Sequence, residues 1–324
     1  MTTDAPSNPL DYRIVSGPPT RPILLRFVDP ANKFRSGPGD PLEAFLRFLA
    51  RYAIDASRQS AAFDGDRLVA YSLCLVGPGA AANVFLPESF PDLPPGFAFS
   101  GVAVEVLKHL NDQMAAWDLA IFQAMVKDED SSQAQIFHRA GYAPICRLTI
   151  MEALVETSED QPDPAGIAWV SFDPDRSETF ARLIIRTYES SLDCPALSGL
   201  RTGLEVLAGH RYSGLFEPRG WWLLKHGPDD AGLVLLNSTE EDPFRLELVY
   251  MGIVPTHRRQ GLGRVLLRRA AHVARSLGKK KIRLAVDTRN VPAVQLYRSV
   301  GFQPVGEQTV LAVLNESRRG KIQL

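Results

Sequence analysis

Apolar and polar positions alternate with two different periods along the chain, and this pattern predicts a mixed α/β fold. From residue 167 onward it reads as one strand, two helices, a group of antiparallel strands, and then strand, helix, strand, helix and strand. The strands are expected at Ile167–Phe172, in GWWLLKH and AGLVLLNS, at Phe244–Val254, at Lys281–Val286 and in VLAVLN near Val310. This order predicts a mixed, mostly antiparallel central sheet flanked by helices, an α/β (α+β) fold.

The helices of the second half are marked by apolar residues at helical spacing and by residues typical of helix ends. Asp175, with Glu178 three residues later, is expected to cap the first helix, and the second is expected near Ser198–Ala208. The third is expected at about Leu262–Leu277, because Gly278 follows it as a typical C-terminal residue. The last helix, in VPAVQLYRSV, has proline in its first turn and glycine after its end.

The first half repeats this organisation more faintly. RLVAYSLCLVGPGAAANVFLP predicts two strands, VAVEVLKHLNDQMAAW a helix and DLAIFQAMV a strand, and Ser132–Tyr142 parallels Val291–Phe302. The acidic, proline-containing segment Glu156–Gly166 has no apolar periodicity and reads as a linker. We therefore expect a first domain at residues 1–155, a linker at 156–166 and a second domain at 167–324.

Composition agrees with two soluble globular domains. The chain has 324 residues, of which 45% are apolar and 23% are charged. It contains neither an apolar stretch of membrane-spanning length nor a signal-peptide pattern at its start. The three cysteines, Cys74, Cys146 and Cys194, are widely spaced, which predicts no disulfide framework and no CxxC metal pair. A reducing, cytoplasmic location is therefore expected.

Charge is distributed unevenly along the chain. The formal net charge is −1, so no overall field favours nucleic acid or membrane, and neither is expected as a partner. Residues 257–289 are nonetheless strongly basic, with Asp287 as their single acidic residue. This segment is expected to bind an anion.

Gly261 and Gly263 lie where the basic segment changes from a strand to a helix. Such a turn makes an anion site, because outward-pointing N–H groups and the helix dipole both favour negative charge. The N–H groups from Arg259 to Arg264 are therefore expected to converge on a diphosphate. Leu266 stands where a dinucleotide fingerprint needs its third glycine, and no P-loop motif occurs. A helix start whose glycines serve only packing is the alternative.

Two linked motifs then resemble the GNAT superfamily of acyl-CoA-dependent N-acetyltransferases. The segment GIVPTHRRQGLG contains the [QR]xxGx[GA] loop of that family, and IRLAVDTRNVPAVQLYRSVGF contains its second motif, with Asn290, Ala293, Leu296–Tyr297 and Gly301–Phe302. The resemblance spans roughly Leu246 to Phe302. It implies two tandem GNAT-like domains, an arrangement similar to that of mycothiol synthase, with acetyl-CoA as the co-substrate.

The first half departs from both motifs. Its loop position would be PESFPDLPPGFAFSG, which contains no arginine and no RxxGxG, and Phe137 stands where Tyr297 stands. By resemblance, the first half is a degenerate copy that lacks CoA binding, and the second half carries catalysis.

The resemblance also implies site residues. Tyr297 is expected to protonate the CoA sulfur, with a core tyrosine as the alternative, and Glu247 is expected to act as the base, with a surface glutamate and a water chain as alternatives. Asn290 is expected to cap the last helix, to bind the CoA arm, or both. The remaining CoA-binding residues are expected to be Ile253, Val254, Arg258, Arg259, Gln260, Gly261, Leu262, Gly263 and Arg264.

The implied reaction is direct transfer of an acetyl group to the primary amine of a small-molecule or peptide acceptor in a ternary complex. Tyr188–Arg201 would form one wall of the acceptor site, where Asp193 could hold an ammonium group. Cys194 could be a nucleophile, but the family transfers the acetyl group directly, so a buried structural thiol is expected. No metal is implied, and an oligomer is left open. A non-catalytic CoA-binding or regulatory module is one alternative. An aminoacyl-tRNA-dependent transferase is another, which the intact loop and the net charge of −1 disfavour.

Overall fold

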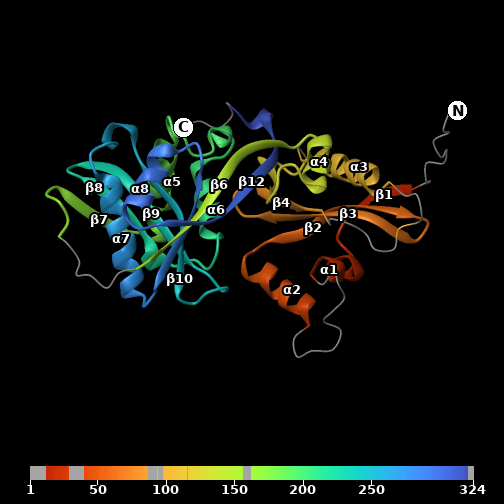
Figure 1. Cartoon of the computed structure of the whole chain (residues 1–324), viewed down its shortest axis with the longest axis horizontal. Coiled ribbons are helices and arrows are strands. Elements are labelled where there is room, and N and C mark those ends of the chain that lie inside the picture. The colour runs from red at the N-terminus through yellow and green to blue at the C-terminus, as the bar shows by residue number, and fades with distance from the viewer. Residues whose placement is uncertain are drawn as a thin grey trace.

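The computed structural model of the chain describes residues 12–28, 40–86, 93, 98–114, 116–155 and 162–319. Within these residues a single twelve-stranded sheet runs along the long axis of the molecule, with helices on both faces (Figure 1). The expected α/β fold with a mostly antiparallel sheet is confirmed.

The two halves repeat the same order of elements. The first half contains β1 (Tyr12–Ser16), α1 (Arg21–Val28), α2 (Pro41–Arg51), β2 (Asp55–Asp64), β3 (Arg67–Gly77), β4 (Ala81–Phe85), α3 (Phe99–Asn111), β5 (Ile121–Val126), α4 (Ser132–Arg139) and β6 (Ala143–Leu154). The second half contains β7 (Ile167–Ser171), α5 (Ser177–Tyr188), α6 (Gly203–Arg211), β8 (Trp221–His226), β9 (Asp229–Ser238), β10 (Arg245–Ile253), α7 (Leu262–Ser276), β11 (Lys281–Asp287), α8 (Val291–Ser299) and β12 (Gln303–Leu314).

The last strands of the two halves are exchanged. The sheet order is β1-β2-β3-β4-β5-β12-β6-β11-β10-β9-β8-β7, so β12 lies beside β5 and β6 lies beside β11. The two exchanged strands also pair with each other, from Gln303 opposite Glu152 to Ala312 opposite Ala143. The pairs β4–β5 and β10–β11 are parallel, and the other neighbours are antiparallel. The division at residues 156–166 stays a proposal, and residues 156–161 lie outside the described part.

Each half of the sheet is covered on both faces by a pair of helices. In the first half α1 and α2 pack on one face, and α3 and α4 pack on the other. In the second half α5 and α6 cover one face, and α7 and α8 cover the other (Figure 1). Burial of these apolar helix stripes is the main stabilising contribution, at roughly 25 cal/mol per Å² of apolar surface.

Helix ends differ from the predictions in two places. Asp173, rather than Asp175, acts as the cap, because its carboxylate accepts the N–H of Asp175 in the 3-10 turn before α5. The second helix begins later than expected, at Gly203, after a capping box made by Thr202 and Glu205.

Two further expectations concern the first half and the membrane. Phe137 is buried in α4, at the place that Tyr297 holds in α8. Of the segment PESFPDLPPGFAFSG, residues 87–92 and 94–97 lie outside the described residues.

Among the helices that are described, none is both long enough and apolar enough to cross a membrane.

Candidate active site

The turn between β10 and α7 contains two residues with left-handed backbone conformation. After β10 ends at Ile253, a short 3-10 turn covers Pro255–His257. Gly261 then precedes α7 with φ +79°, and Arg259 has φ +61°. Glycine adopts positive φ without the steric cost of a Cβ atom. This reversal places the N-terminus of the fifteen-residue helix α7 close after the end of the strand.

Five successive main-chain N–H groups remain undonated at this turn. The N–H groups of residues 259–263 donate to no acceptor in the described part of the chain, and no side chain caps α7. The first N–H groups of a helix have no acceptor within the helix, and the dipole adds partial positive charge there. The exposed side chains of Arg259 and Arg264 also form no ion pair with a described residue. The arrangement suits a phosphate-bearing ligand.

The two positions of the turn need glycine for different structural reasons. A Cβ at Gly261 would meet no atom within 4 Å, so this position faces open space. A Cβ at Gly263 would lie 2.6 Å from Cδ2 of Leu296 on α8. Gly263 therefore allows close packing of α7 against α8, which is the packing role weighed above as the alternative, whereas Gly261 is required by its backbone conformation.

Arg258 makes contacts other than those expected of a phosphate ligand. Its guanidinium donates to the main-chain oxygens of Glu189 at 2.7 Å, Thr187 and Ile253 at 3.0 Å and Ser190 at 3.1 Å. These bonds tie the end of α5 to the end of β10. Four of its five guanidinium N–H groups thus donate to protein oxygens, which leaves one for a ligand, and contact between Arg258 and the diphosphate stays a prediction.

The other residues predicted to bind CoA also lie at this turn. The side chain of Gln260 donates to the oxygen of Thr256 at 3.0 Å, and Leu262 is buried under α7. The N–H of Val254 donates to Ala231 on β9 at 3.0 Å, so it points away from β11. Because N–H directions alternate along a strand, the N–H of Ile253 points to the opposite side.

β10 and β11 diverge next to this turn. They pair at only three positions, Arg245 with Lys281, Leu246 with Ile282 and Glu247 with Arg283. Beyond Glu247 the two strands separate, and a bulge shifts the register between β10 and β9 at Leu248–Tyr250. Main-chain groups on the facing edges of β10 and β11 are thereby freed from pairing, as expected for a place where a ligand lies along a strand.

Tyr297 is buried on α8, on the face of the sheet that α7 covers. Its side chain packs in the core with Leu262, and its ring lies 5.7 Å from that of Phe302. Burial, followed by the negative charge of Asp193, raises the pKa of the phenol well above its ordinary value of 10. The hydroxyl forms no hydrogen bond with the described residues. Tyr297 is therefore a protonated donor.

Glu247 is the last residue of β10 that pairs with β11, and its side chain lies on the other face of the sheet. Its Oε1 accepts from Nε of Arg245 at 2.7 Å, and that guanidinium also donates to Glu241 at 2.9 Å. Leu246 and Leu248 belong to the core under α7, so Glu247 points toward the α5–α6 face. Glu247 and Tyr297 are thus not brought to one side of the sheet.

Asn290 caps α8. Its Oδ1 accepts the N–H of Ala293 at 3.4 Å, and its own N–H donates to the oxygen of Asp287 at 2.9 Å. The capping role, one of the two expected for this residue, is confirmed. By fixing the start of α8 it also fixes where Tyr297 lies.

A disulfide joins the two halves, contrary to the sequence-based expectation. Cys146 on β6 is bonded to Cys194, which precedes α6, and their Cα atoms lie 5.6 Å apart. The predictions of no disulfide and of a free structural thiol at Cys194 are therefore wrong. The two residues are 48 positions apart and belong to different halves, so no spacing rule indicates the pair. Cys74 is free and buried.

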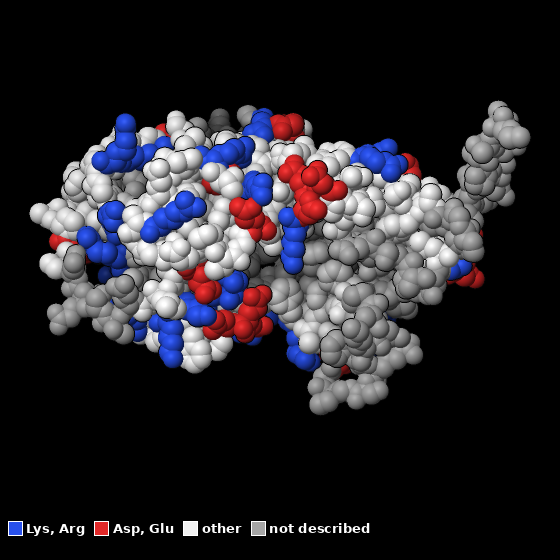
Figure 2. Space-filling view, in the orientation of Figure 1, with Lys and Arg blue, Asp and Glu red and all other residues white. Residues whose placement is uncertain are grey.

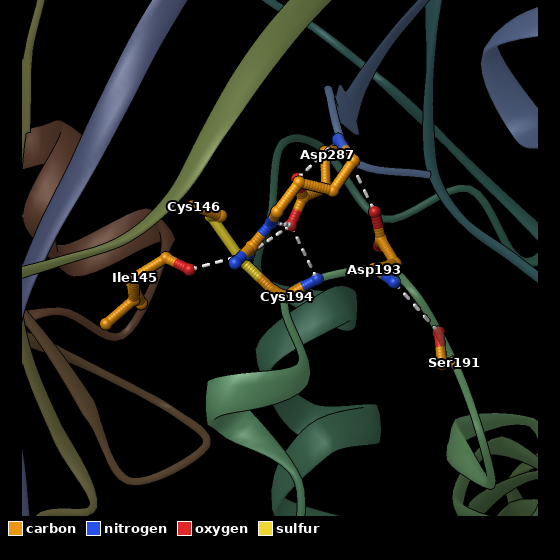
Figure 3. Close-up of polar contacts among 7 residues, drawn as sticks. Ile145, Cys146, Ser191, Asp193, Cys194 and Asp287 are labelled. Atoms are coloured by element: carbon orange, nitrogen blue, oxygen red, sulfur yellow. Dashed lines mark hydrogen bonds and ion pairs between the residues drawn. A yellow bond between two sulfur atoms is a disulfide. The ribbon is translucent and has the colours of Figure 1, made fainter. Parts of the chain in front are cut away.

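A buried carboxylate lies beside the disulfide (Figure 3). Asp287 is fully buried and accepts from the guanidinium of Arg289 at 2.6 Å and from the N–H of Cys194 at 3.1 Å. Burial opposes ionisation, but these hydrogen bonds hold the pKa of Asp287 below its ordinary value. Asp287 and both cysteine sulfurs lie within 4.8 Å of one another. They do not fit a metal ion, because the sulfurs are bonded to each other and Arg289 already neutralises the carboxylate.

An aromatic group that the sequence did not single out covers the α5–α6 face of β10. The hydroxyls of Tyr250 and Thr187 lie 2.7 Å apart, and the ring of Tyr250 stacks on His210 at 4.9 Å and lies 5.6 Å from the ring of Tyr188. Burial and then the charge of Arg201 lower the pKa of His210 to about 3, so this histidine is neutral. Gly252 is the feature of the sequence that could have indicated this close packing, because a Cβ there would lie 2.6 Å from Oγ1 of Thr187.

Basic side chains are spread over the second half, as its sequence predicts. Figure 2 shows Lys and Arg on the face that carries α7 and α8, at the left of the view. Several of them have partners: Lys281 and Arg283 each lie 3.6 Å from Glu152, and Arg269 lies over the ring of Trp222 at 3.7 Å. Arg259 and Arg264 at the α7 turn are exposed and are among the arginines without such a partner in the described part of the chain.

Known proteins resemble the chain both in sequence and in fold. Residues 187–302 match the model of the acetyltransferase (GNAT) family. A mycothiol acetyltransferase of Thermomonospora curvata is 26% identical over 229 residues, covering 66% of this chain and 74% of that protein.

Two solved structures share the fold along almost the whole chain. A GCN5-related N-acetyltransferase from Sphaerobacter thermophilus is 16% identical with a TM-score of 0.57, and the match covers 96% of this chain and 98% of that one. A tandem GNAT protein from the clavulanic acid biosynthesis pathway is 16% identical with a TM-score of 0.53, and the match covers 94% and 98%. Residues 187–302 are therefore similar to the acetyltransferase (GNAT) family, and the fold of almost the whole chain is similar to that of these two structures.

Proposed function

We propose that the protein transfers the acetyl group of acetyl-CoA directly to the primary amine of a small-molecule or peptide acceptor in a ternary complex. The observation that carries this proposal is the row of five undonated N–H groups at the start of α7, beside the divergence of β10 from β11. The relative that is named a mycothiol acetyltransferase supports a small-molecule acceptor.

In this proposal the CoA diphosphate lies on the N–H groups of the α7 turn. Charge-assisted hydrogen bonds from Arg259 and Arg264 add to these contacts. The pantetheine arm follows the free edge of β10 at Ile253, and Arg258 and Val254 hold that edge in place through their bonds to the protein. The N–H groups of the turn belong to Arg259, Gln260, Gly261, Leu262 and Gly263.

The reaction then consists of one addition and one elimination. The neutral amine attacks the thioester carbonyl, and undonated N–H groups at the divergent strands stabilise the negative charge that develops on its oxygen. When the carbon–sulfur bond breaks, Tyr297 donates its proton to the leaving thiolate. Its raised pKa keeps the phenol protonated until that step.

The amine must lose a proton before it attacks. Glu247 stays a proposed base, but the carboxylate is held by Arg245 at 2.7 Å. A chain of water molecules in place of Glu247 is the alternative kept open by the sequence.

The full chain is the right material for a test. Acetyl-CoA is titrated into it by calorimetry, and a panel of primary amines is then incubated with enzyme and acetyl-CoA while acetylated product and free CoA are measured by mass spectrometry. We expect micromolar binding and stoichiometric formation of both products with at least one amine. Binding without any product would favour the regulatory module, and no binding would contradict the proposal.

A further inference from the structure

Three segments that are distant in sequence converge around the Cys146–Cys194 disulfide. They are Ile145–Cys146 at the start of β6, residues 193–194 before α6, and Asp287–Arg289 at the end of β11 (Figure 3). Arg289 links two of them, because it donates to the oxygen of Ile145 and to Asp287. The Cys146–Cys194 disulfide links the third segment to β6. The segment that carries Asp193 is thus fixed to both β6 and the end of β11.

Asp193 forms a reciprocal contact with the end of β11. Its Oδ1 accepts the N–H of Asp287 at 3.1 Å, and the next residue, Cys194, donates its N–H to Asp287 at 3.1 Å. These two bonds fix the direction of the Asp193 side chain. Its second oxygen, Oδ2, accepts from no group in the described residues.

The other carboxylates considered for the site already have partners. Asp287 is fully buried and is neutralised by Arg289. Glu247 is paired with Arg245, which also binds Glu241. Of these three residues, only Asp193 is exposed and also has a carboxylate oxygen that accepts from no described group. A cation entering the site therefore meets its strongest unmet acceptor at Asp193.

The negative charge of Asp193 acts on phenols from three elements. Its charge contributes to raising the pKa of Tyr297 on α8, Tyr250 on β10 and Tyr188 on α5. The residue is reached by solvent, yet its carboxylate is surrounded by enough protein that burial raises its own pKa, ahead of the opposing effect of the Asp287 N–H. Aromatic faces and a carboxylate together suit an ammonium group.

We propose that Asp193 binds the ammonium group of the acceptor and takes the proton that the nitrogen must lose before attack. This inference rests on the proposed function and names its acceptor as a protonated primary amine. Asp193 thus replaces Glu247 as the first proton acceptor, because its Oδ2 accepts from no described group, whereas the Glu247 carboxylate is held by Arg245.

The protons and bonds balance in this scheme. The ammonium gives one proton to the Asp193 carboxylate, and the neutral nitrogen forms a bond to the acetyl carbon. The carbon–sulfur bond breaks, Tyr297 gives its proton to sulfur, and the nitrogen returns its second proton to Tyr297. Asp193 then releases its proton to water, so the products are the amide, free CoA and one proton.

The test uses two CoA thioethers of equal length, one ending in an ammonium group and the other in a methyl group. S-(3-aminopropyl)-CoA and S-butyl-CoA form such a pair, and homologues with one methylene fewer or more cover the spacing. Their affinities for the full chain are measured by calorimetry. We expect the ammonium probe to bind about tenfold more tightly than the methyl probe, the effect of one charge-assisted hydrogen bond.

Variants of Asp193 isolate its contribution. In Asp193→Asn, which keeps the oxygen that accepts from Asp287, the preference for the ammonium probe should disappear while S-butyl-CoA binds as before. Asp193→Glu should restore part of the preference, and Asp175→Asn, at an exposed position before α5, should leave it unchanged.

Three outcomes have distinct meanings. A tenfold preference that survives in Asp193→Asn would overturn the assignment of Asp193. Equal binding of both probes to the wild type at every chain length would do the same and leave the proposed CoA site intact. If neither probe binds, the proposed function itself fails, and this inference fails with it.

Discussion

Cys146 and Cys194 are joined by a disulfide that ties β6 of the first half to the segment of the second half that carries Asp193. The disulfide lies beside the hydrogen bond between Asp193 and Asp287. The covalent link between the halves is therefore next to the proposed acceptor side of the active site. A sheet that exchanges its last strands is thus fastened near its middle.

The disulfide can be tested by counting thiols. Because the structure pairs Cys146 with Cys194, denatured, unreduced protein should take up one iodoacetamide label, at Cys74, and reduced protein should take up three. Peptide mapping by mass spectrometry gives the count and the positions. Three labels without reductant would show that the bond does not form.

Loss of the disulfide should weaken the acceptor side more than the CoA side. Cys146→Ser should lower unfolding stability by about 3 kcal/mol, from the loop that the bond closes. It should also reduce the preference for the ammonium-tipped CoA probe, because Asp193 is held less firmly, while S-butyl-CoA affinity stays constant. Cys74→Ala is the matched control, and a fall in S-butyl-CoA affinity alone would contradict this account.

Removal of the Tyr297 hydroxyl should affect turnover. Tyr297→Phe keeps the packing against Phe302, so acetyl-CoA affinity should change little while kcat falls roughly a hundredfold. Burial raises the pKa of the phenol above 10, so the wild type keeps its donor and the defect should be constant from pH 7 to 9. Steady-state kinetics with the amine found in the panel measures both effects. Tyr212→Phe is a partly exposed control, and unchanged kcat in Tyr297→Phe would remove Tyr297 from the mechanism.

The strand exchange predicts that the halves cannot be separated by a single cut. β12 pairs with β5 and β6, and β6 pairs with β11, so each half made alone would lack a strand from its sheet. A protease site placed within residues 156–166 should yield two fragments that still elute together in size-exclusion chromatography. Two separate peaks under native conditions would show that the strands are not exchanged.

Local pattern and motif predicted much of the fold and part of the site. The order of elements in the second half follows from helical spacing and from residues such as Gly278, which lies after α7 in the expected left-handed conformation. The glycine turn was also predictable, because positive φ at Gly261 is a local property of the chain. The site residues from Ile253 to Arg264 lie at that turn because they are continuous in sequence.

The remaining features depend on contacts between distant segments. β6 and β12 are both long strands, and nothing in their sequences specifies which half each one joins. The Cys146–Cys194 bond, the hold of Arg258 on α5 and the approach of Leu296 to Gly263 likewise require tertiary structure. The cap at Asp173 was missed for a different reason, since two nearby aspartates compete for the same role.

The central claim is that main-chain N–H groups at Gly261 hold the CoA diphosphate, and acetyl-CoA titrations of Gly261→Asn and Gly261→Asp test it most directly. Both side chains have nearly the same shape, and both residues are among those that tolerate positive φ, so only the charge facing the open space differs. We predict that the Asn variant binds within about tenfold of the wild type and that the Asp variant binds about a hundredfold more weakly than Asn. Equal affinity of the Asp and Asn variants would contradict the account.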